Sequence, residues 1–133
     1  MGLFSRKPKV SRVLRKLKHS DNYDFEISGE SFHTRNLLSI FHNLNMNSAS
    51  SQIVEATLSR DPFNEYDKNA VEVLVQDLLV GYIPKEQARK VSKLLDNPID
   101  KGEATISAEV RRANEIGFSS VNLNLKWPPE LLD

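Results

Sequence analysis

The side chains with the most evident chemistry lie in residues 60–71, which read R-D-P-F-N-E-Y-D-K-N-A-V. This stretch offers two aromatic rings, Phe63 and Tyr66, and two carboxylates, Asp61 and Asp67. Aromatic rings provide stacking surface, and an ionised carboxylate accepts hydrogen bonds. A connecting turn in solvent needs no aromatic ring, so the combination predicts a rigid polar loop that recognises a ligand.

A second interpretation assigns the same residues to construction of the turn. Pro62 fixes its own φ angle, and Asp61 before it can bond the downstream backbone. Asp67 would likewise cap the backbone amides near Asn69, and Tyr66 would pack on the domain. The residue types alone leave both interpretations open.

A catalytic interpretation is also available, because Asp61 and Asp67 could perform acid–base chemistry or hold a divalent metal. Aspartates in turns far more often cap backbone amides. The chain has no GxGxxG, Walker or GxSxG motif and no cysteine, and its histidines (His19, His33 and His42) lack the spacing of a metal site. We therefore expect neither an enzyme nor a bound metal or cofactor.

The elements that must position this loop follow from the hydrophobic pattern. Short alternating or apolar runs predict six strands, at residues 23–28, 53–60, 70–75, 79–83, 104–111 and 121–127. The loop then joins the second strand to the third. Gly29 ends the first strand, residues 43–52 form a polar loop, and Pro128 ends the last strand because proline cannot donate to a ladder.

Two helices are predicted between these strands. Thr34 caps a helix over residues 35–43. Pro84 opens a second helix that runs to about Leu95, since proline is well tolerated in the first turn. The pattern therefore predicts a mainly β (α+β) domain, a small six-stranded antiparallel barrel with two short helices, whose closure would remove exposed strand edges.

The net charge of zero over 133 residues hides a division. Residues 1–18 hold seven Lys or Arg side chains and no acidic one, which leaves the remainder at −7. Apolar residues recur there at helical spacing (Val10, Val13, Leu14 and Leu17), which predicts a basic amphipathic helical tail. We therefore expect an N-terminal extension over residues 1–20 and a β-barrel domain over residues 21–133.

The basic tail has several candidate roles. It can dock on its own domain, contact the phosphate backbone or a partner protein, or lie on a membrane surface. No apolar run is long enough to span a bilayer, and the first residues lack the apolar core of a signal peptide. We expect a cytoplasmic protein.

The loop sequence also resembles a known family. Residues 60–71, followed by V-G-Y-I-P at residues 80–84, resemble the HIRAN domain, and G-E-S-F-H at residues 29–33 is similar to its first-strand motif. The similarity runs from about Ile27 to Asp96 and identifies a stand-alone HIRAN domain protein. It implies an OB-like barrel that binds single-stranded DNA at a free 3′ end, as in helicase-like transcription factor, in DNA repair or replication.

The resemblance implies roles for individual residues. Phe32 and Tyr66 match rings that stack on terminal bases, and Asp67 matches the carboxylate that receives the 3′-hydroxyl. Lys85 matches a lysine near phosphate, and Phe118 matches a further stacking ring. The DNA-binding residues implied in this way are Phe32, His33, Asn64, Tyr66, Asp67, Tyr82, Lys85 and Phe118.

Departures from the family pattern weaken the expected affinity for phosphate. Ser31 stands where the DNA-binding member has an arginine, Glu65 replaces the usual proline, and the body of the chain is acidic. The alternative function is therefore a protein-interaction adaptor that keeps the fold without binding DNA. For single side chains, the alternatives are burial of Phe32 in the core and simple solvation of Lys85.

Overall fold

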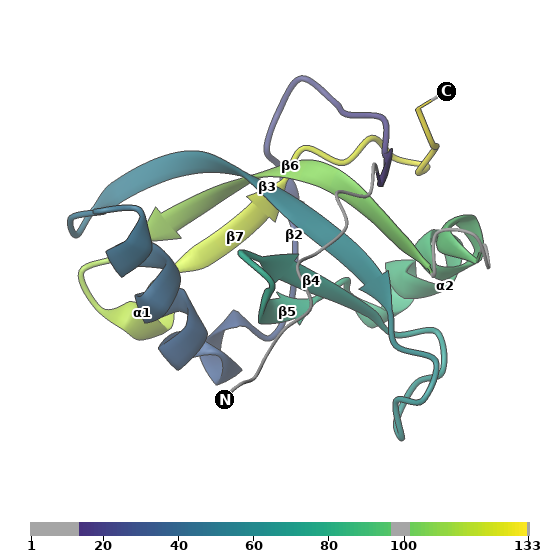
Figure 1. Cartoon of the computed structure of the whole chain (residues 1–133), viewed down its shortest axis with the longest axis horizontal. Coiled ribbons are helices and arrows are strands. Elements are labelled where there is room, and N and C mark those ends of the chain that lie inside the picture. Colours follow the sequence, from purple (N-terminus) through teal and green to yellow (C-terminus); the bar gives the residue numbers. More distant parts are fainter. Residues whose placement is uncertain (1–13, 97–101, 133) are drawn as a thin grey trace, which may run out of the picture.

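The fold is organised by β3 (Ser50–Arg60), the longest strand in the residues that this computed structural model describes, 14–96 and 102–132 (Figure 1). Along one side β3 pairs with β6 (Glu103–Arg112) through ten antiparallel residue pairs. Along the other side it pairs with β4 (Val71–Val75), again antiparallel. The loop of interest connects the paired ends of β3 and β4.

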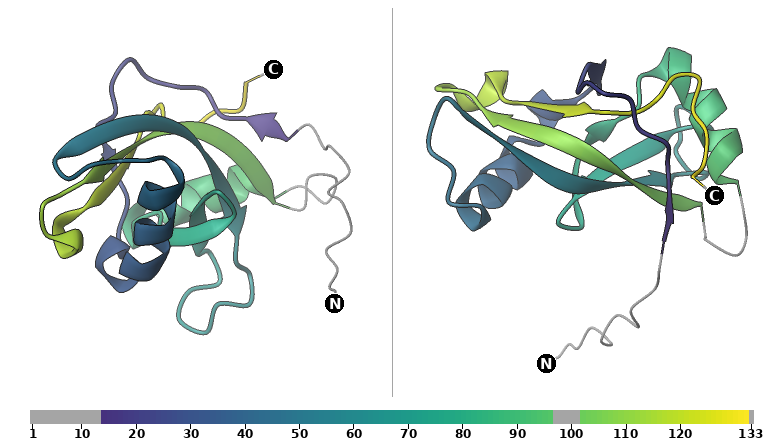
Figure 2. Two further views of the ribbon diagram at one scale, coloured as in Figure 1. Left: turned by 60° about the vertical axis from the view of Figure 1, so that its left-hand side comes forward. Right: turned by 90° about the horizontal axis from the view of Figure 1, so that it is seen from above.

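The other elements extend or cover this central pair. They are β1 (Arg15–Lys16), β2 (Phe25–Glu26), the 3-10 helix η1 (Glu30–Phe32), α1 (Thr34–Asn43), β5 (Leu78–Tyr82), α2 (Lys85–Leu95), the 3-10 helix η2 (Ile116–Phe118) and β7 (Ser120–Leu123). The strand order is β2-β7-β6-β3-β4-β5 with antiparallel neighbours, and β1 pairs parallel with β6. The sheet curls into a half-barrel (Figure 2).

The two outer strands of the half-barrel meet at one point. Ser28, just after β2, forms an isolated antiparallel bridge with Tyr82 at the end of β5. The Ser28 amide donates to the Tyr82 carbonyl at 2.9 Å, and the Tyr82 amide donates to the Ser28 carbonyl at 2.8 Å. Gly81 permits this approach, because a Cβ there would lie 2.5 Å from the Ser28 carbonyl oxygen. The absence of a side chain at Gly81 thus lets the two outer edges of the half-barrel come into contact at this point.

The core fills the curled sheet and is covered by a helix at each end (Figure 1). α1 buries Leu37, Ile40 and Phe41 completely, and the Asn36 Nδ2 donates to the Leu79 carbonyl at 2.8 Å, which ties the helix to β5. α2 buries Ala88, Val91, Ser92 and Leu95. Burial of each large apolar side chain contributes about 1.5–3 kcal/mol, so both helices are held mainly by these contacts.

The predicted mainly β architecture is confirmed, and so are both helices and the strands around the loop. The central strands keep the predicted inward alternation, with Leu58, Val71, Val73 and Val75 fully buried. The chain reverses between β4 and β5 at Gln76-Asp77, where both residues have positive φ (54° and 63°). Positive φ at both central positions is typical of the tight hairpin turn whose twist matches the strands.

The outer strands differ from the prediction. Residues 23–28 contain only the short β2, and residues 121–127 contain only β7. The alternation of apolar and polar residues indicates which side chains are buried, but it does not show that every residue pairs with a neighbouring strand. Phe25 and Ile27 are both buried, although Ile27 lies outside β2. After β7 the chain leaves β6, and Leu125 bridges His19 instead. The sheet therefore has seven strands in the described residues, because β1 joins the six that were predicted.

Two predicted boundaries are also wrong. The polar loop over residues 43–52 is shorter, because β3 begins at Ser50, where exposed polar side chains hide the strand from a hydrophobic pattern. α1 begins at Thr34 itself, with His33 as its N-cap and no side-chain cap hydrogen bond. The chain enters α1 directly from η1, with the His33 amide donating to the Glu30 carbonyl at 2.9 Å, which leaves no extended capping residue.

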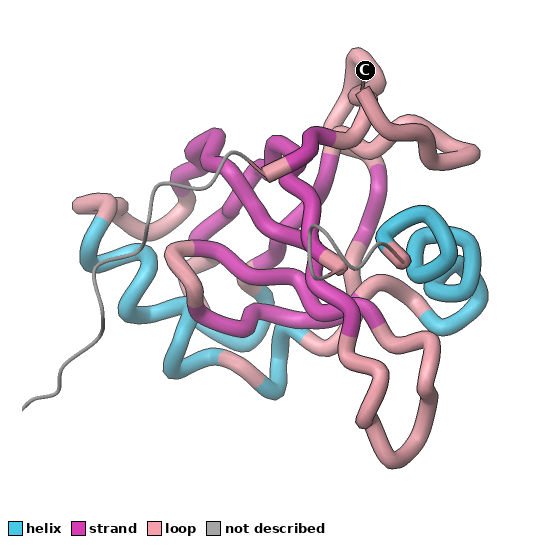
Figure 3. Tube along the Cα trace, turned by 45° about the vertical axis from the view of Figure 1, so that its right-hand side comes forward, coloured by secondary structure: helices cyan, strands magenta, loops and turns pink. Residues whose placement is uncertain are grey.

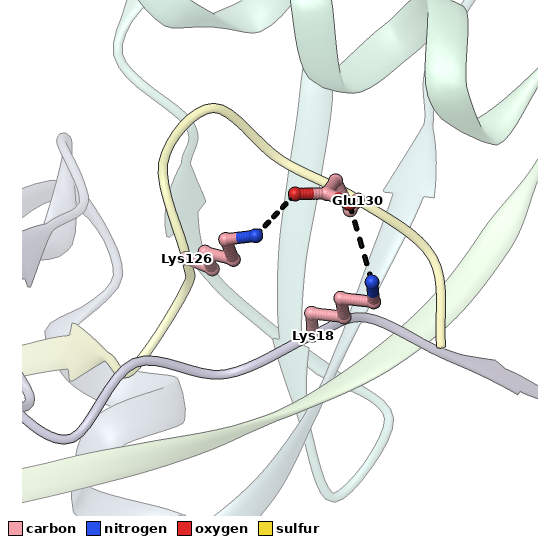
Figure 4. Close-up of polar contacts among 3 residues, drawn as sticks. All are labelled: Lys18, Lys126 and Glu130. Carbon is pink, nitrogen blue, oxygen red and sulfur yellow. Dashed lines mark hydrogen bonds and ion pairs between the residues drawn. The ribbon is translucent and has the colours of Figure 1, made fainter. Parts of the chain in front are cut away.

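The described end of the predicted basic helix is extended instead. β1 lies beside β6, and the Leu17 amide donates to the Thr105 carbonyl at 2.9 Å, which buries the Leu17 side chain. Lys18 and Lys126 both bind Glu130, so the segment is also tied to the end of the chain (Figure 4). These hydrogen bonds lower the pKa of the Glu130 carboxyl. Residues 1–13 of the predicted helix lie outside the described residues.

The close approach at Gly81 generates a stability prediction. Gly81→Ala places a methyl group against a backbone carbonyl that cannot move without breaking the bridge. Overpacking of this kind costs about 1–3 kcal/mol, and we expect a loss of that size in the free energy of unfolding measured with urea. Gly117→Ala is the matched control, because its Cβ would meet nothing within 4 Å. Equal stability of the two variants would contradict the proposed role of the close approach.

Candidate nucleic-acid interface

The loop between β3 and β4 is organised by the side chain of Asn64. Its Oδ1 accepts hydrogen bonds from the amides of Tyr66 and Asp67 at 2.9 and 3.1 Å. Its Nδ2 donates to the Asp61 carboxylate at 3.1 Å. One amide side chain therefore joins the start of the loop to its centre, which is how a loop without regular structure acquires a defined shape.

Both ends of the loop are closed by further hydrogen bonds. The Asp61 amide donates to the Ala70 carbonyl at 2.9 Å, and the Ala70 amide donates to the Asp67 carbonyl at 3.0 Å. The Asp67 Oδ1 accepts from the Asn69 amide at 2.9 Å. The predicted structural role of Asp67 as a backbone cap is thus confirmed. No hydrogen bond engages the second carboxylate oxygen of Asp67 within the described residues, and the side chain is partly exposed.

The aromatic rings of the loop point away from the domain. Phe63 is 94% exposed and Tyr66 is 89% exposed, so neither ring packs on the barrel. The alternative that Tyr66 supports the turn by packing on the domain is wrong. Phe63 was not among the implied DNA-binding residues, although its ring type in a polar loop was a visible signal. Both rings are free to stack on a ligand.

A second pair of exposed rings lies on the two 3-10 helices. Phe32 ends η1 and is 86% exposed, so the alternative that it belongs to the core is wrong. Phe118 ends η2 and is 77% exposed. η1 packs beside η2, and the Glu30 Oε2 accepts from the Val121 amide at 3.3 Å. Burial raises the pKa of the Glu30 carboxyl, although this hydrogen bond opposes the shift.

Tyr82 connects the loop to the 3-10 helices. It is bridged to Ser28, which precedes η1, and its register partner on β4 is Glu72. Burial raises the pKa of the Tyr82 phenol, and the charges of Glu72 and Asp61 raise it further. Burial also raises the pKa of the Glu72 carboxyl, with a smaller contribution from Asp61. Tyr82 therefore keeps its proton at neutral pH beside two acidic groups at the base of the loop.

Two of the elements that carry these residues lie on the same side of the sheet. η1 and the β3–β4 loop both project from the same side of the sheet (Figures 1 and 3). The chain from Tyr82 leads directly to Lys85, the exposed first residue of α2. The structure thus groups Asn64, Tyr66 and Asp67 in the loop and Phe32 and Phe118 on the paired 3-10 helices. His33 is the partly buried N-cap of α1 and lies next to Phe32.

The catalytic interpretation of Asp61 and Asp67 would need further acidic or histidine side chains close by to hold a metal ion. Among the described residues, no group of three or more His, Asp or Glu side chains is arranged to hold a metal ion. Within the same residues, no helix is long and apolar enough to cross a membrane.

These features define a small mainly β domain with an aromatic surface beside a hydrogen-bonded loop. The HIRAN domain family model matches residues 23–124, which is most of the chain, and the protein belongs to this family. HIRAN domains are generally nucleic-acid-binding domains. Neither the curated proteins nor the solved structures gave a significant match.

The hydrogen bonds of Asn64 generate a prediction about the order of the loop. In Asn64→Ala the amides of Tyr66 and Asp67 lose their acceptor. We expect the free energy of unfolding to fall by about 1–2 kcal/mol. This is less than the summed contribution of the lost hydrogen bonds, because the loop is partly exposed. Hydrogen exchange at these two amides should become faster. Glu65→Ala, at the position between Asn64 and Tyr66, removes none of these bonds and serves as the control. Unchanged exchange in Asn64→Ala would refute the assigned role.

Proposed function

We propose that this HIRAN domain binds single-stranded DNA at a free 3′ end, in DNA repair or replication, and that it does so without catalysing a reaction. The observation that carries the proposal is the exposure of four aromatic rings, Phe32, Phe63, Tyr66 and Phe118. Rings of this size are ordinarily buried, because burial of a Phe side chain contributes about 1.5–3 kcal/mol. Their joint exposure is best explained by a ligand with flat apolar faces.

Unstacked nucleobases match this requirement. Base–aromatic stacking contributes about 1–3 kcal/mol per base and is tolerant of sequence, because every base has a π-face. Rings on the loop and on the 3-10 helices can therefore hold more than one base without reading their identity. Bases within a duplex are already stacked, which favours a single strand as the ligand.

Asp67 supplies the proposed preference for a 3′-hydroxyl. One carboxylate oxygen caps the Asn69 amide and so holds the group in place, while the other is available to a ligand. A carboxylate accepts a hydrogen bond from a hydroxyl but repels a phosphate. A strand that ends in a 3′-hydroxyl is therefore favoured over one that ends in a 3′-phosphate.

The remaining site residues suit the backbone near the strand end. Tyr82 has a phenol that stays protonated and can donate a hydrogen bond. Lys85 is exposed on the first turn of α2 and offers a cation to phosphate. The bridge between Ser28 and Tyr82 supports an OB-like barrel, a partly open architecture that binds oligonucleotides. We further propose a cytoplasmic location.

An alternative function, a protein-binding adaptor, is favoured by the acidic groups around the loop. Asp61 and Glu72 lie at its base, and Glu65 lies within it. These charges oppose phosphate binding. An adaptor would retain the exposed rings as an apolar contact surface for a protein partner.

The carboxylate of Asp67 generates the test of the proposed function. Asp67→Asn keeps the side-chain oxygen that caps Asn69 and removes the charge. We expect wild-type protein to bind a 3′-hydroxyl oligothymidylate at least about tenfold more tightly than the 3′-phosphate form, since a hydrogen bond to a charged acceptor contributes about 1.5–3 kcal/mol. Asp67→Asn should lose most of this ratio in fluorescence anisotropy.

Glu65→Gln is the matched control, because it removes a charge from the same loop without touching the cap. It should raise the affinity for both oligonucleotides and leave their ratio unchanged. Equal binding of the two oligonucleotides by wild-type protein would overturn 3′-end recognition. No binding of either one at low salt would favour the adaptor.

A further inference from the structure

The solvent face of α2 carries a stripe of cations. Lys85, Arg89 and Lys93 recur at every fourth position and are exposed, so they follow one line along the helix. At 1.5 Å rise per residue this line spans about 12 Å. Lys90 lies beside the stripe, and Glu86 is the one acidic residue within α2 itself. The face is therefore strongly positive on a body that is otherwise acidic.

Stability of the helix does not explain this arrangement. Lys85 and Arg89 lie in the N-terminal half of α2, where the helix dipole favours acidic side chains. Like charges at i, i+4 destabilise a helix by about 0.2–0.5 kcal/mol per pair, and the stripe contains two such pairs. None of the three stripe cations forms an ion pair with an acidic side chain in residues 14–96 or 102–132.

The stripe lies beside the base of the loop site, because both ends of α2 are tied to it. Lys85 follows Tyr82 by three residues, and Asp96, just after α2, forms an ion pair with Arg60 at the start of the loop (2.7 Å). α2 therefore lies at the same end of the molecule as the β3–β4 loop (Figures 1 and 3). A strand whose end occupies the loop site can continue along the helix.

The C-terminal half of the helix borders a partly apolar surface. A shallow pocket there is lined by Lys90, Lys93, Leu94, Pro128 and Pro129. The Lys90 Nζ lies 5.9 Å from the centre of the Trp127 ring, which is itself partly exposed. Cations beside an exposed ring and a shallow apolar floor suit a chain that alternates phosphates with flat bases.

We propose that the solvent face of α2, with Arg89 and Lys93 as its principal contacts, binds the phosphate backbone of the strand whose 3′ end lies in the loop site. The inference rests on the proposed function, because binding of the 3′ end in the loop site decides which way the strand runs along α2. It explains how an acidic domain with few cations near the loop holds DNA: the attraction to phosphate comes from α2, and the loop reads the end.

The experiment measures the salt dependence of binding for a short and a long strand. Each phosphate contact on a single strand contributes about −0.7 to the slope of log K against log salt concentration. For a thymidine dodecanucleotide with a 3′-hydroxyl, R89Q/K93Q should reduce the magnitude of this slope by about 1.4 and weaken binding several-fold at low salt. A thymidine trinucleotide should bind wild-type and variant protein equally, with the preference for 3′-hydroxyl unchanged.

The control variant is K16Q/R111Q, which removes two exposed cations from β1 and from the far end of β6. It should leave the slope at its wild-type value. Three results would each overturn the proposal. They are an equal reduction of the slope in this control, an unchanged slope in R89Q/K93Q, and no binding of the dodecanucleotide by wild-type protein. A smaller slope in R89Q/K93Q but not in the control would support binding of the phosphate backbone by α2. This holds even if wild-type protein binds 3′-hydroxyl and 3′-phosphate strands equally, a result that would refute end recognition alone.

Discussion

The arrangement of the candidate site depends on the backbone bridge between Ser28 and Tyr82. Its two hydrogen bonds join the outer strands of a half-barrel, and they form only because residue 81 has no side chain to meet the Ser28 carbonyl. The bridge fixes η1, which follows at once, next to β5. It thereby places η1, which carries Phe32, on the same side of the molecule as the loop between β3 and β4. The bridge thus acts together with the hydrogen bond from the Val121 amide to the Glu30 Oε2, which also holds η1 in place.

The loop combines a structural role, set by its hydrogen bonds, with the recognition role that we propose for its side chains. Asn64 uses its whole amide group to shape the loop, and the neighbouring rings of Phe63 and Tyr66 are exposed. Asp67 divides its two oxygens between a backbone amide and the solvent side. For Asp67, the two interpretations that the residue type left open are therefore compatible. A loop held in shape before binding loses less conformational entropy when a ligand arrives.

Local patterns in the sequence predicted the centre of this structure and missed its long-range contacts. The strands on either side of the loop followed from alternation at Leu58, Val71 and Val73, and the cap at Asp67 followed from its residue type. Neither β1 nor the bridge at Ser28 has a periodic signature. Lys18 and Glu130 are 112 positions apart, and no local pattern reports such a pairing. The stripe on α2 was visible in the spacing of its cations, but its position beside the loop required the fold.

The central claim is that the loop and the 3-10 helices form one binding site. Chemical-shift mapping of isotope-labelled protein with a short 3′-hydroxyl oligothymidylate tests it most directly. The account predicts that the amides of residues 29–33 and those of residues 64–69 shift together, with one apparent dissociation constant. Shifts confined to one of these segments, or centred on the opposite face of β3 and β6, would contradict it.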